Sequence, residues 1–349
     1  MKNYIKSLII KASKPIFLGV LLLSGNWAKA QLSGTVTVGT GGTYTNFTAL
    51  ATAISTSGVN GALTVNVITN VTESATVTFA QNGSNPATST NTITINGGNY
   101  TFSNSATYEA IALNGIDYLT IKNLVIQKTG TGTAQIGVRF YGGADYNTID
   151  GCTIEYTALS TGSTAGGAYI AFASSNTSLT SISSTHNGSY NTINNCLMRT
   201  TSSNSPGPTY AICDQQGSSF YSSTASNNTF SNNNIQNFFN FAIRNFYTNG
   251  EQFLNNTITR ANATSTNCNS RVTIFYSYYT YSTSRSTKFD GNTVKDLPSV
   301  NATISTGFTS TFYGVFAYYN YGNSTNKFSV SSNTLKFLDI PNFLQKINA

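Results

Sequence analysis

One short pattern of apolar and polar positions recurs along the chain. It runs apolar, any residue, Asn or Gly (Ser once), a variable residue, any residue, apolar. The seven copies are IKNLVI (121–126), IDGCTI (149–154), INNCLM (193–198), FSNNNI (230–235), FLNNTI (253–258), FDGNTV (289–294) and VSSNTL (330–335). Because their starts lie 28, 44, 37, 23, 36 and 41 residues apart, a constant structural unit carries loops of variable length.

Each copy predicts two short strands that meet at a sharp corner. The corner residues are of types that tolerate a left-handed backbone; examples are Gly151, Asn195, Asn232, Asn255 and Gly291. A further strand pattern lies between the copies, at 110–112, 137–139, 169–171, 211–213, 242–244, 273–275 and 314–316. A β-sandwich would not repeat one corner seven times. We therefore predict an all-β fold, a right-handed parallel β-helix with three short strands per rung and about eight rungs.

The fourth position of the corner pattern predicts a ladder of side chains. In chain order it holds Leu124, Cys152, Cys196, Asn233, Asn256, Asn292 and Asn333. Stacked rungs lie about 4.8 Å apart, so the four asparagines are expected to hydrogen-bond from rung to rung. For Cys152 and Cys196 two interpretations stay open: a disulfide between adjacent rungs, or a stack of buried thiols.

The N-terminal residues predict a cap for the first rung. Phe47, Leu50, Ala51 and Ile54 fall on one face of a helix, and Asn46 suits its N-cap. A short amphipathic helix there would cover the open end of the stack, as the ends of repeat proteins require. The predicted segments are a signal peptide (1–30), an N-terminal strand with the capping helix (31–60), and the β-helix (61–349).

Most of the net positive charge of the chain comes from the first thirty residues. A basic start, an apolar run at 16–23 and the sequence AKA at 28–30 indicate a secretory signal peptide. Five of the 18 Lys and Arg residues lie there, which leaves 13 basic against 11 acidic residues. This balance removes the argument for nucleic-acid binding, and 8% charged residues exclude helical bundles. No later stretch resembles a transmembrane segment, so we expect a secreted or surface-attached protein.

The repeated corner and its asparagine ladder resemble the right-handed parallel β-helix proteins of the pectin-lyase-like superfamily, over roughly residues 60–340. The opening at 36–44 and the stretch 61–65 are similar to secreted β-helix proteins exported by Bacteroidetes-type bacteria. Many of those end in a sorting domain, which is not visible here, so the chain is either a fragment or departs from them. The superfamily includes lyases, hydrolases, esterases and non-catalytic adhesins, so the resemblance implies a fold rather than an activity.

Candidate catalytic and metal-binding residues are few. His186 is the only histidine, which excludes a multi-histidine metal site within one chain. No cofactor is predicted, although calcium stays open because Asp and backbone oxygens can bind it. The residues expected on the outer face of the third strand are Arg139, Ala171, Cys213, Arg244, Phe275 and Phe316.

Asp214 is the sole acid near those outer positions. Arg244 with Asp214 could mimic part of a polysaccharide lyase site, but a structural ion pair is the simpler interpretation. Two carboxylates within reach of each other are not apparent, which argues against a hydrolase that uses paired acids.

Aromatic residues gather on the later rungs. Strand alternation sends every second side chain outward, which predicts an exposed strip. Its members are Tyr276, Tyr278, Tyr281, Phe316, Tyr318 and Tyr321. Such a strip suits stacking against sugar rings, or else the tyrosines simply cover strand surfaces. The sequence thus favours a secreted glycan-binding or adhesive protein; the alternatives are a polysaccharide lyase and a purely structural stalk.

Overall fold

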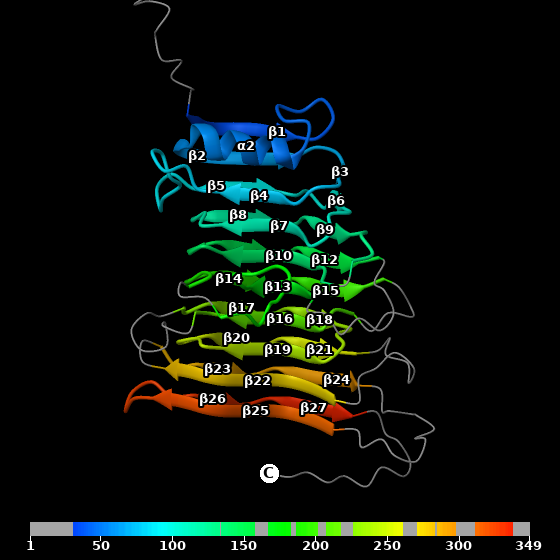
Figure 1. Ribbon diagram of the computed structural model, residues 1–349, viewed down its shortest axis with the longest axis vertical. Helices are drawn as coiled ribbons and strands as arrows, with labels where there is room; N and C mark the ends of the chain where they lie inside the picture. The colour runs from blue at the N-terminus through cyan, green and yellow to red at the C-terminus, as the bar shows by residue number, and fades with distance from the viewer. Residues whose placement is uncertain are drawn as a thin grey trace, which may run out of the picture. The chain divides into compact units, whose positions relative to one another are not determined.

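A computed structural model describes residues 31–132, 134–157, 167–182, 186–201, 207–217, 226–260, 271–282, 285–297 and 311–337. The predicted signal peptide lies outside these residues. The described chain folds into three parallel sheets, and successive strands visit the sheets in turn (Figure 1). This is the right-handed parallel β-helix that the repeated corner predicts.

We call the three sheets A, B and C. Sheet A has the order β1 (Leu32–Val38), β2 (Val59–Val67), β5 (Ile93–Asn96), β8 (Leu119–Lys122), β11 (Thr148–Asp150), β14 (Thr192–Asn194), β17 (Thr229–Ser231), β20 (Gln252–Leu254), β23 (Lys288–Asp290) and β26 (Ser329–Ser331). Sheet B has the order β3 (Val71–Glu73), β6 (Thr101–Asn104), β9 (Val125–Lys128), β12 (Thr153–Tyr156), β15 (Leu197–Thr200), β18 (Asn234–Gln236), β21 (Thr257–Thr259), β24 (Thr293–Leu297) and β27 (Thr334–Phe337).

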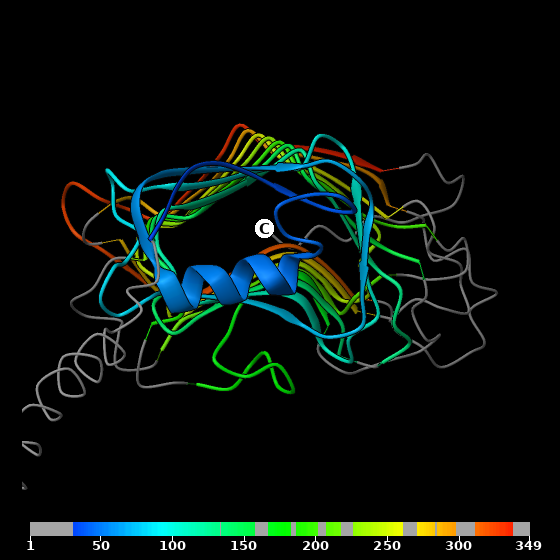
Figure 2. The same cartoon turned by 90° about the horizontal axis from the view of Figure 1, so that it is seen from above.

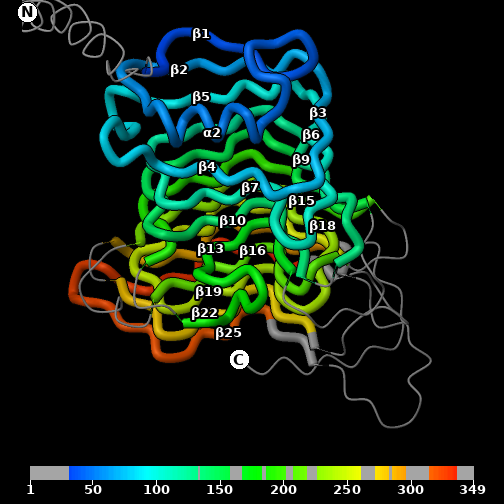
Figure 3. Tube along the Cα trace, turned by 45° about the horizontal axis from the view of Figure 1, so that its top comes forward, coloured from blue at the N-terminus to red at the C-terminus, as the bar shows by residue number. Residues whose placement is uncertain are grey.

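Sheet C carries the longer strands. Its order is β4 (Val77–Ala80), β7 (Glu109–Asn114), β10 (Ile136–Tyr141), β13 (Ala168–Phe172), β16 (Tyr210–Gln215), β19 (Phe241–Phe246), β22 (Arg271–Ser282) and β25 (Thr311–Gly322). Figure 3 shows these strands one below another. At 12 residues each, β22 and β25 exceed the short strands that the sequence predicts.

The core consists of inward columns, one from each sheet. The two apolar ends of every corner pattern form the columns of sheets A and B: Ile121 pairs with Ile149, and Ile126 pairs with Ile154. Further along sheet A the aliphatic residues give way to stacked phenylalanines, with the rings of Phe230 and Phe253 4.7 Å apart. The repeat in the sequence is therefore a repeat of buried positions.

Left-handed residues make the corners between sheets A and B. Gly151 (φ 62°), Asn195 (53°), Asn232 (55°), Asn255 (55°) and Gly291 (68°) all have positive φ, as the pattern predicts. Asparagine and glycine adopt this conformation with the least strain.

Helix α2 (Phe47–Ser57) closes the N-terminal end, as predicted. Its N-cap Asn46 accepts a hydrogen bond from the backbone N–H of Ala49 (2.8 Å). The carboxylate of Glu73 also accepts from the N–H of Phe47 (2.8 Å), where the helix dipole favours negative charge. The helix packs on β4, at the end of sheet C (Figure 2).

Candidate functional site

The asparagines of the corner pattern are fully engaged in hydrogen bonds. Nδ2 of Asn256 donates to the carbonyl of Phe230 and to Oδ1 of Asn292, both at 3.0 Å. Oδ1 of Asn256 accepts from the backbone N–H and from Nδ2 of Asn233, both at 3.0 Å. Asn292 makes the same contacts to Phe253 and Asn333. These side chains are structural, and none is free to bind a ligand.

The two cysteines of the corner pattern are free, buried thiols. Sγ of Cys196 lies 3.3 Å from the carbonyl of Asn194 and 3.6 Å from that of Ile149. Sγ of Cys152 lies 3.5 Å from the carbonyl of Ile121. The sulfur atoms thus occupy the positions that amides take in later rungs. Burial raises the pKa of Cys152 to about 12, so the thiol is held in its protonated form.

Arg244 and Asp214 do not form the ion pair considered from the sequence. In the register of β16 and β19, Arg244 lies beside Cys213 and Asp214 lies beside Asn245, so the two side chains point to opposite faces of sheet C. Nη1 of Arg244 donates to Oε1 of Gln215 at 2.6 Å. Arg244 thus lies on the outer face, whereas Asp214 lies inside the β-helix.

Phe275 also lies on a different face of sheet C from the one that the sequence predicts. It was expected on the outer face, but it pairs with Ile243 in the inward column and is completely buried. Tyr276 holds the outer position beside Arg244. The long insertion before β22 hides this one-residue shift from the sequence pattern, and a one-residue shift reverses every side chain of a strand.

Part of the outer face of sheet C is covered by protein. Ala171 and Cys213 belong to a second apolar cluster with Leu179, which lies on the segment after β13. On the neighbouring rung Arg139 is buried and forms an ion pair of 2.8 Å with Glu109. Arg244 is buried as well, so the exposed part of this face lies over β22 and β25.

The six aromatic residues predicted as a strip lie together on β22 and β25. They form three pairs across the two strands: Tyr276 with Phe316 (ring centroids 5.0 Å apart), Tyr278 with Tyr318 (5.7 Å) and Tyr281 with Tyr321 (5.0 Å). We call these six residues the aromatic strip. Phe316, Tyr318 and Tyr321, on the last described strand of sheet C, are 38%, 47% and 44% exposed, and Tyr276, Tyr278 and Tyr281 are partly exposed.

Tyrosines at left-handed positions extend this aromatic surface, and the sequence pattern did not reveal them. Among the described residues other than glycine with positive φ, seven are asparagines, six are tyrosines and one is a serine. A bulky side chain is strained at positive φ. The six tyrosines form two columns of stacked rings, Tyr118–Tyr146–Tyr190 and Tyr247–Tyr279–Tyr319. The first column lies just before the sheet A strands β8, β11 and β14. In the second column Tyr247 directly follows β19, and Tyr279 and Tyr319 lie within β22 and β25.

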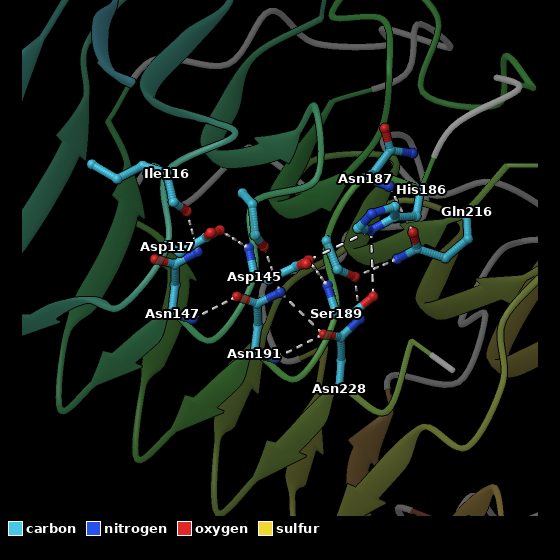
Figure 4. Close-up of polar contacts among 12 residues, drawn as sticks. Ile116, Asp117, Asp145, Asn147, His186, Asn187, Ser189, Asn191, Gln216 and Asn228 are labelled. Carbon is cyan, nitrogen blue, oxygen red and sulfur yellow. Dashed lines mark hydrogen bonds and ion pairs between the residues drawn. The ribbon is translucent and has the colours of Figure 1, made fainter. Parts of the chain in front are cut away.

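A second asparagine ladder follows the first tyrosine column in the chain, and Figure 4 shows the asparagines. Asn147, Asn191 and Asn228 each follow a left-handed residue and are buried. The N–H of Asn147 donates to Oδ1 of Asn191, and the N–H of Asn191 to Oδ1 of Asn228 (2.8 and 2.9 Å). The sequence carries a signal for this turn, because DYLTI (117–121), DYNTI (145–149) and SYNTI (189–193) repeat in step with the corner pattern.

Two aspartates stand in line beside these tyrosines. The N–H of Asp145 donates to Oδ1 of Asp117 (2.8 Å), and the N–H of Ser189 donates to Oδ1 of Asp145 (2.7 Å). Nδ1 of His186 lies 3.5 Å from Oδ1 of Asp145 (Figure 4). Burial raises the pKa of Asp145 to about 6, although His186 and the N–H of Ser189 oppose the shift. Carboxylates on adjacent rungs thus approach each other, contrary to the expectation from sequence.

The described residues contain neither a metal-binding cluster of acids, histidines and cysteines nor a membrane-spanning helix. Within the described part of the chain, no group of three or more His, Cys, Asp or Glu residues could hold a metal ion. No described helix has the length and apolar character needed to cross a membrane. Neither the known family models nor the curated proteins include a match to this sequence. The function must therefore be argued from the surface itself.

Proposed function

We propose that the protein is a secreted or cell-surface binding protein that recognises a neutral polysaccharide through the aromatic strip and the adjoining tyrosine column Tyr247–Tyr279–Tyr319. The observation that carries the proposal is the contiguity of exposed rings on β22 and β25. Tyr278 contacts the rings of both Tyr318 and Tyr319, so strip and column form one surface. Contiguous exposed apolar surface commonly marks a binding site.

The stacking of the rings limits how a sugar can bind. The rings of Tyr279 and Tyr319 stack at 4.8 Å with an angle of 18° between their planes, so they occupy each other's faces. A sugar can then stack only on a ring with a free face, whereas the other tyrosines offer ring edges and hydroxyl groups. Because these groups repeat once per rung, a polymer with repeating hydroxyls fits the surface better than a single sugar does.

Backbone strain supports a functional role for the tyrosines. A left-handed tyrosine costs roughly 1–2 kcal/mol more than glycine at the same position. Stacking with neighbours returns about 0.5–1.5 kcal/mol per pair. Earlier rungs use Gly115 and Gly142 just after their sheet C strands, where later rungs place Tyr247, Tyr279 and Tyr319. Stacking therefore roughly offsets the strain, and we attribute the choice of tyrosine rather than glycine at these positions to binding.

The chemistry around the strip favours an uncharged ligand. None of the six strip residues is charged, and Arg244, which neighbours Tyr276 in register, has its guanidinium 3.5 Å from the ring centroid of Phe246. The predicted signal peptide supports secretion. Enzymatic activity has no comparable support, because Arg244 and Asp214 lie on opposite faces of sheet C.

A glycan array followed by affinity measurements tests the proposal. The purified protein should bind neutral polysaccharides, and the double variant Tyr278→Ala/Tyr318→Ala should bind at least about 10-fold more weakly, which corresponds to about 1.4 kcal/mol. Tyr100→Ala is the matched control, because Tyr100 is 38% exposed but lies outside the strip. Absence of glycan binding by the wild type, or equal binding by the double variant, would contradict the proposal.

A further inference from the structure

Along the inner face of sheet C, the buried side chains change from apolar to polar. One inward column of this sheet passes through Phe140 and Phe172 and continues in register with Asp214, Asn245 and Ser277. Asp214 and Asn245 are completely buried, and so is Glu251 in the turn that follows β19. Two carboxyl groups therefore lie in the core, where an isolated charge is strongly unfavourable.

The hydrogen bonds of these three residues leave several polar atoms without a partner. Oδ1 of Asp214 accepts from Nε2 of Gln216 (2.8 Å), and Oε1 of Glu251 accepts from the N–H of Asn228 (3.5 Å). Oδ2 of Asp214, Oε2 of Glu251 and both amide atoms of Asn245 have no hydrogen-bond partner of good geometry, although the side chains of Ser226 and Thr248 lie close enough to the carboxyl group of Glu251 to lower its pKa. Buried polar atoms are nearly always paired in folded proteins, so this group of atoms calls for an explanation.

The two carboxyl groups lie on either side of one residue. Glu251 contacts the backbone N–H of Asn228, and Asp214 is close enough to its side-chain amide for that amide to lower the pKa of Asp214. Burial, and then the charge of Glu251, act in the opposite direction and raise the pKa of Asp214 well above its usual range. The two acids are thus neighbours whose negative charges oppose each other.

Nearby cations do not neutralise this pair. Arg285 lies near enough to lower the pKa of Glu251 through its charge. Its guanidinium donates to the carbonyls of Gly250 and Asn228 and to the hydroxyl of Thr229 instead. In the part of the chain that the structure describes, neither Asp214 nor Glu251 forms an ion pair.

The space around these unpartnered atoms decides whether a water molecule or a metal ion could bind to them. The unpartnered atoms have almost no surface that a water molecule could touch, so a bound water does not account for them. A calcium ion approaches its oxygen ligands to about 2.3–2.6 Å, closer than the roughly 2.7–2.8 Å of a hydroxyl hydrogen bond. Its charge would also compensate both carboxylates.

We propose that Asp214, Asn245 and Glu251 form a calcium site inside the β-helix, with Oδ2 of Asp214, Oε2 of Glu251 and the amide oxygen of Asn245 as ligands. The ion would join the rung of β16 to the rung of β19 from within. Calcium suits the set because it accepts carboxylate and amide oxygens in irregular geometry. The site lies inside the core, so it is independent of the proposed glycan surface.

Calcium removal and return tests this site. The purified protein is dialysed against EGTA at pH 8, and its thermal midpoint is measured as calcium chloride is added. We expect about one calcium ion per chain by elemental analysis and a midpoint at least about 3 °C higher in millimolar calcium. Asp214→Asn and Glu251→Gln should abolish this response. In EGTA both variants should be at least as stable as the wild type, because an amide removes a buried charge.

Two further variants distinguish a loss of calcium binding from a loss of folding. Glu155→Gln is the matched control, because Glu155 pairs with Arg199 on sheet B and should leave the calcium response intact. Asn245→Ala keeps both carboxylates and should weaken calcium binding at least about 10-fold even if the other variants fail to fold. A wild-type midpoint that depends on pH but not on calcium would overturn the proposal in favour of a protonated acid. A full response in Asp214→Asn would overturn it as well.

Discussion

In the earlier rungs the corner between sheets A and B holds Leu124, Cys152 and Cys196, whereas the later rungs hold asparagine at the same position. The backbone is the same in both regions, since Asn195 and Asn255 have φ values of 53° and 55°. The side chains differ in what they contribute. A buried thiol contacts carbonyl oxygens weakly, whereas each internal asparagine of the ladder makes four hydrogen bonds.

The same two regions differ inside sheet C and in the turn that follows it. The interior changes from Phe140 and Phe172 to Asp214 and Asn245, and the turn changes from Gly142 to Tyr247. Stacking of the rungs keeps the backbone conformation constant, whereas the side-chain type in each column changes along the axis of the β-helix. At the corner between sheets A and B, the earlier rungs bury apolar side chains and thiols, whereas the later rungs bury amides that are satisfied by hydrogen bonds.

The largest effect is expected where the ladder is most fully bonded. Asn256→Leu would remove four hydrogen bonds and leave the carbonyl of Phe230 and the N–H of Asn233 buried without partners. We expect unfolding to become easier by about 4 kcal/mol, measured by urea denaturation followed by circular dichroism. The equivalent Cys196→Ala should cost about 1 kcal/mol. Asn234→Ala is the control; Asn234 is exposed on β18, so its change should stay within about 0.5 kcal/mol. Equal losses of stability in Cys196→Ala and Asn256→Leu would show that the thiol and amide corners contribute equally.

The two ends of the described β-helix provide the next test. Leu50 of α2 is completely buried, whereas Leu335 on the last described rung is 44% exposed although it continues an inward column. Leu50→Ala should cost about 3 kcal/mol, and Leu335→Ala less than about 1 kcal/mol. Thermal unfolding of both variants would show this. A loss at Leu335 as large as that at Leu50 would mean that the two ends are equally buried in solution.

The sequence predicted the fold well because the fold consists of repeated positions. Ile121 and Ile126 mark the buried ends of the corner, and Asn46 marks the start of α2. Long insertions break this periodicity, which is why Phe275 was placed on the wrong face. The approach of Asp117 to Asp145 depends on how two neighbouring rungs align. These residues are 28 positions apart in the sequence, and the sequence pattern alone did not predict their contact. The left-handed tyrosines were missed because their type does not predict that conformation.

A smaller effect is expected from extending the ladder into the earlier rungs. In Cys196→Asn the new amide would donate to the carbonyl of Ile149, as Asn233 does to Ile193 (3.0 Å), and would accept from the N–H of Cys152. We expect stability to rise by up to about 1 kcal/mol, measured by urea denaturation. Cys213→Asn is the matched variant without a ladder, because Cys213 lies on the covered outer face of sheet C between Leu179 and Arg244. It should cost about 1–3 kcal/mol. A similar loss at position 196 would show that the earlier rungs do not accept amides.

The smallest effect concerns acid–base behaviour on the earlier rungs. The pKa of Asp145 is raised from its usual 3.8 to about 6, so between these pH values the folded protein binds more protons than the unfolded chain. Its contribution to stability is present below about pH 4 and is lost as the pH rises through about 6. Asp145→Asn should flatten the stability profile in this window, while an amide oxygen still accepts from Ser189. Thermal midpoints at several pH values measure the slope, and Asp290→Asn on β23 should retain it. If Asp145→Asn leaves the slope unchanged, the carboxyl group titrates as it does in water, and burial in this turn has no consequence for its charge.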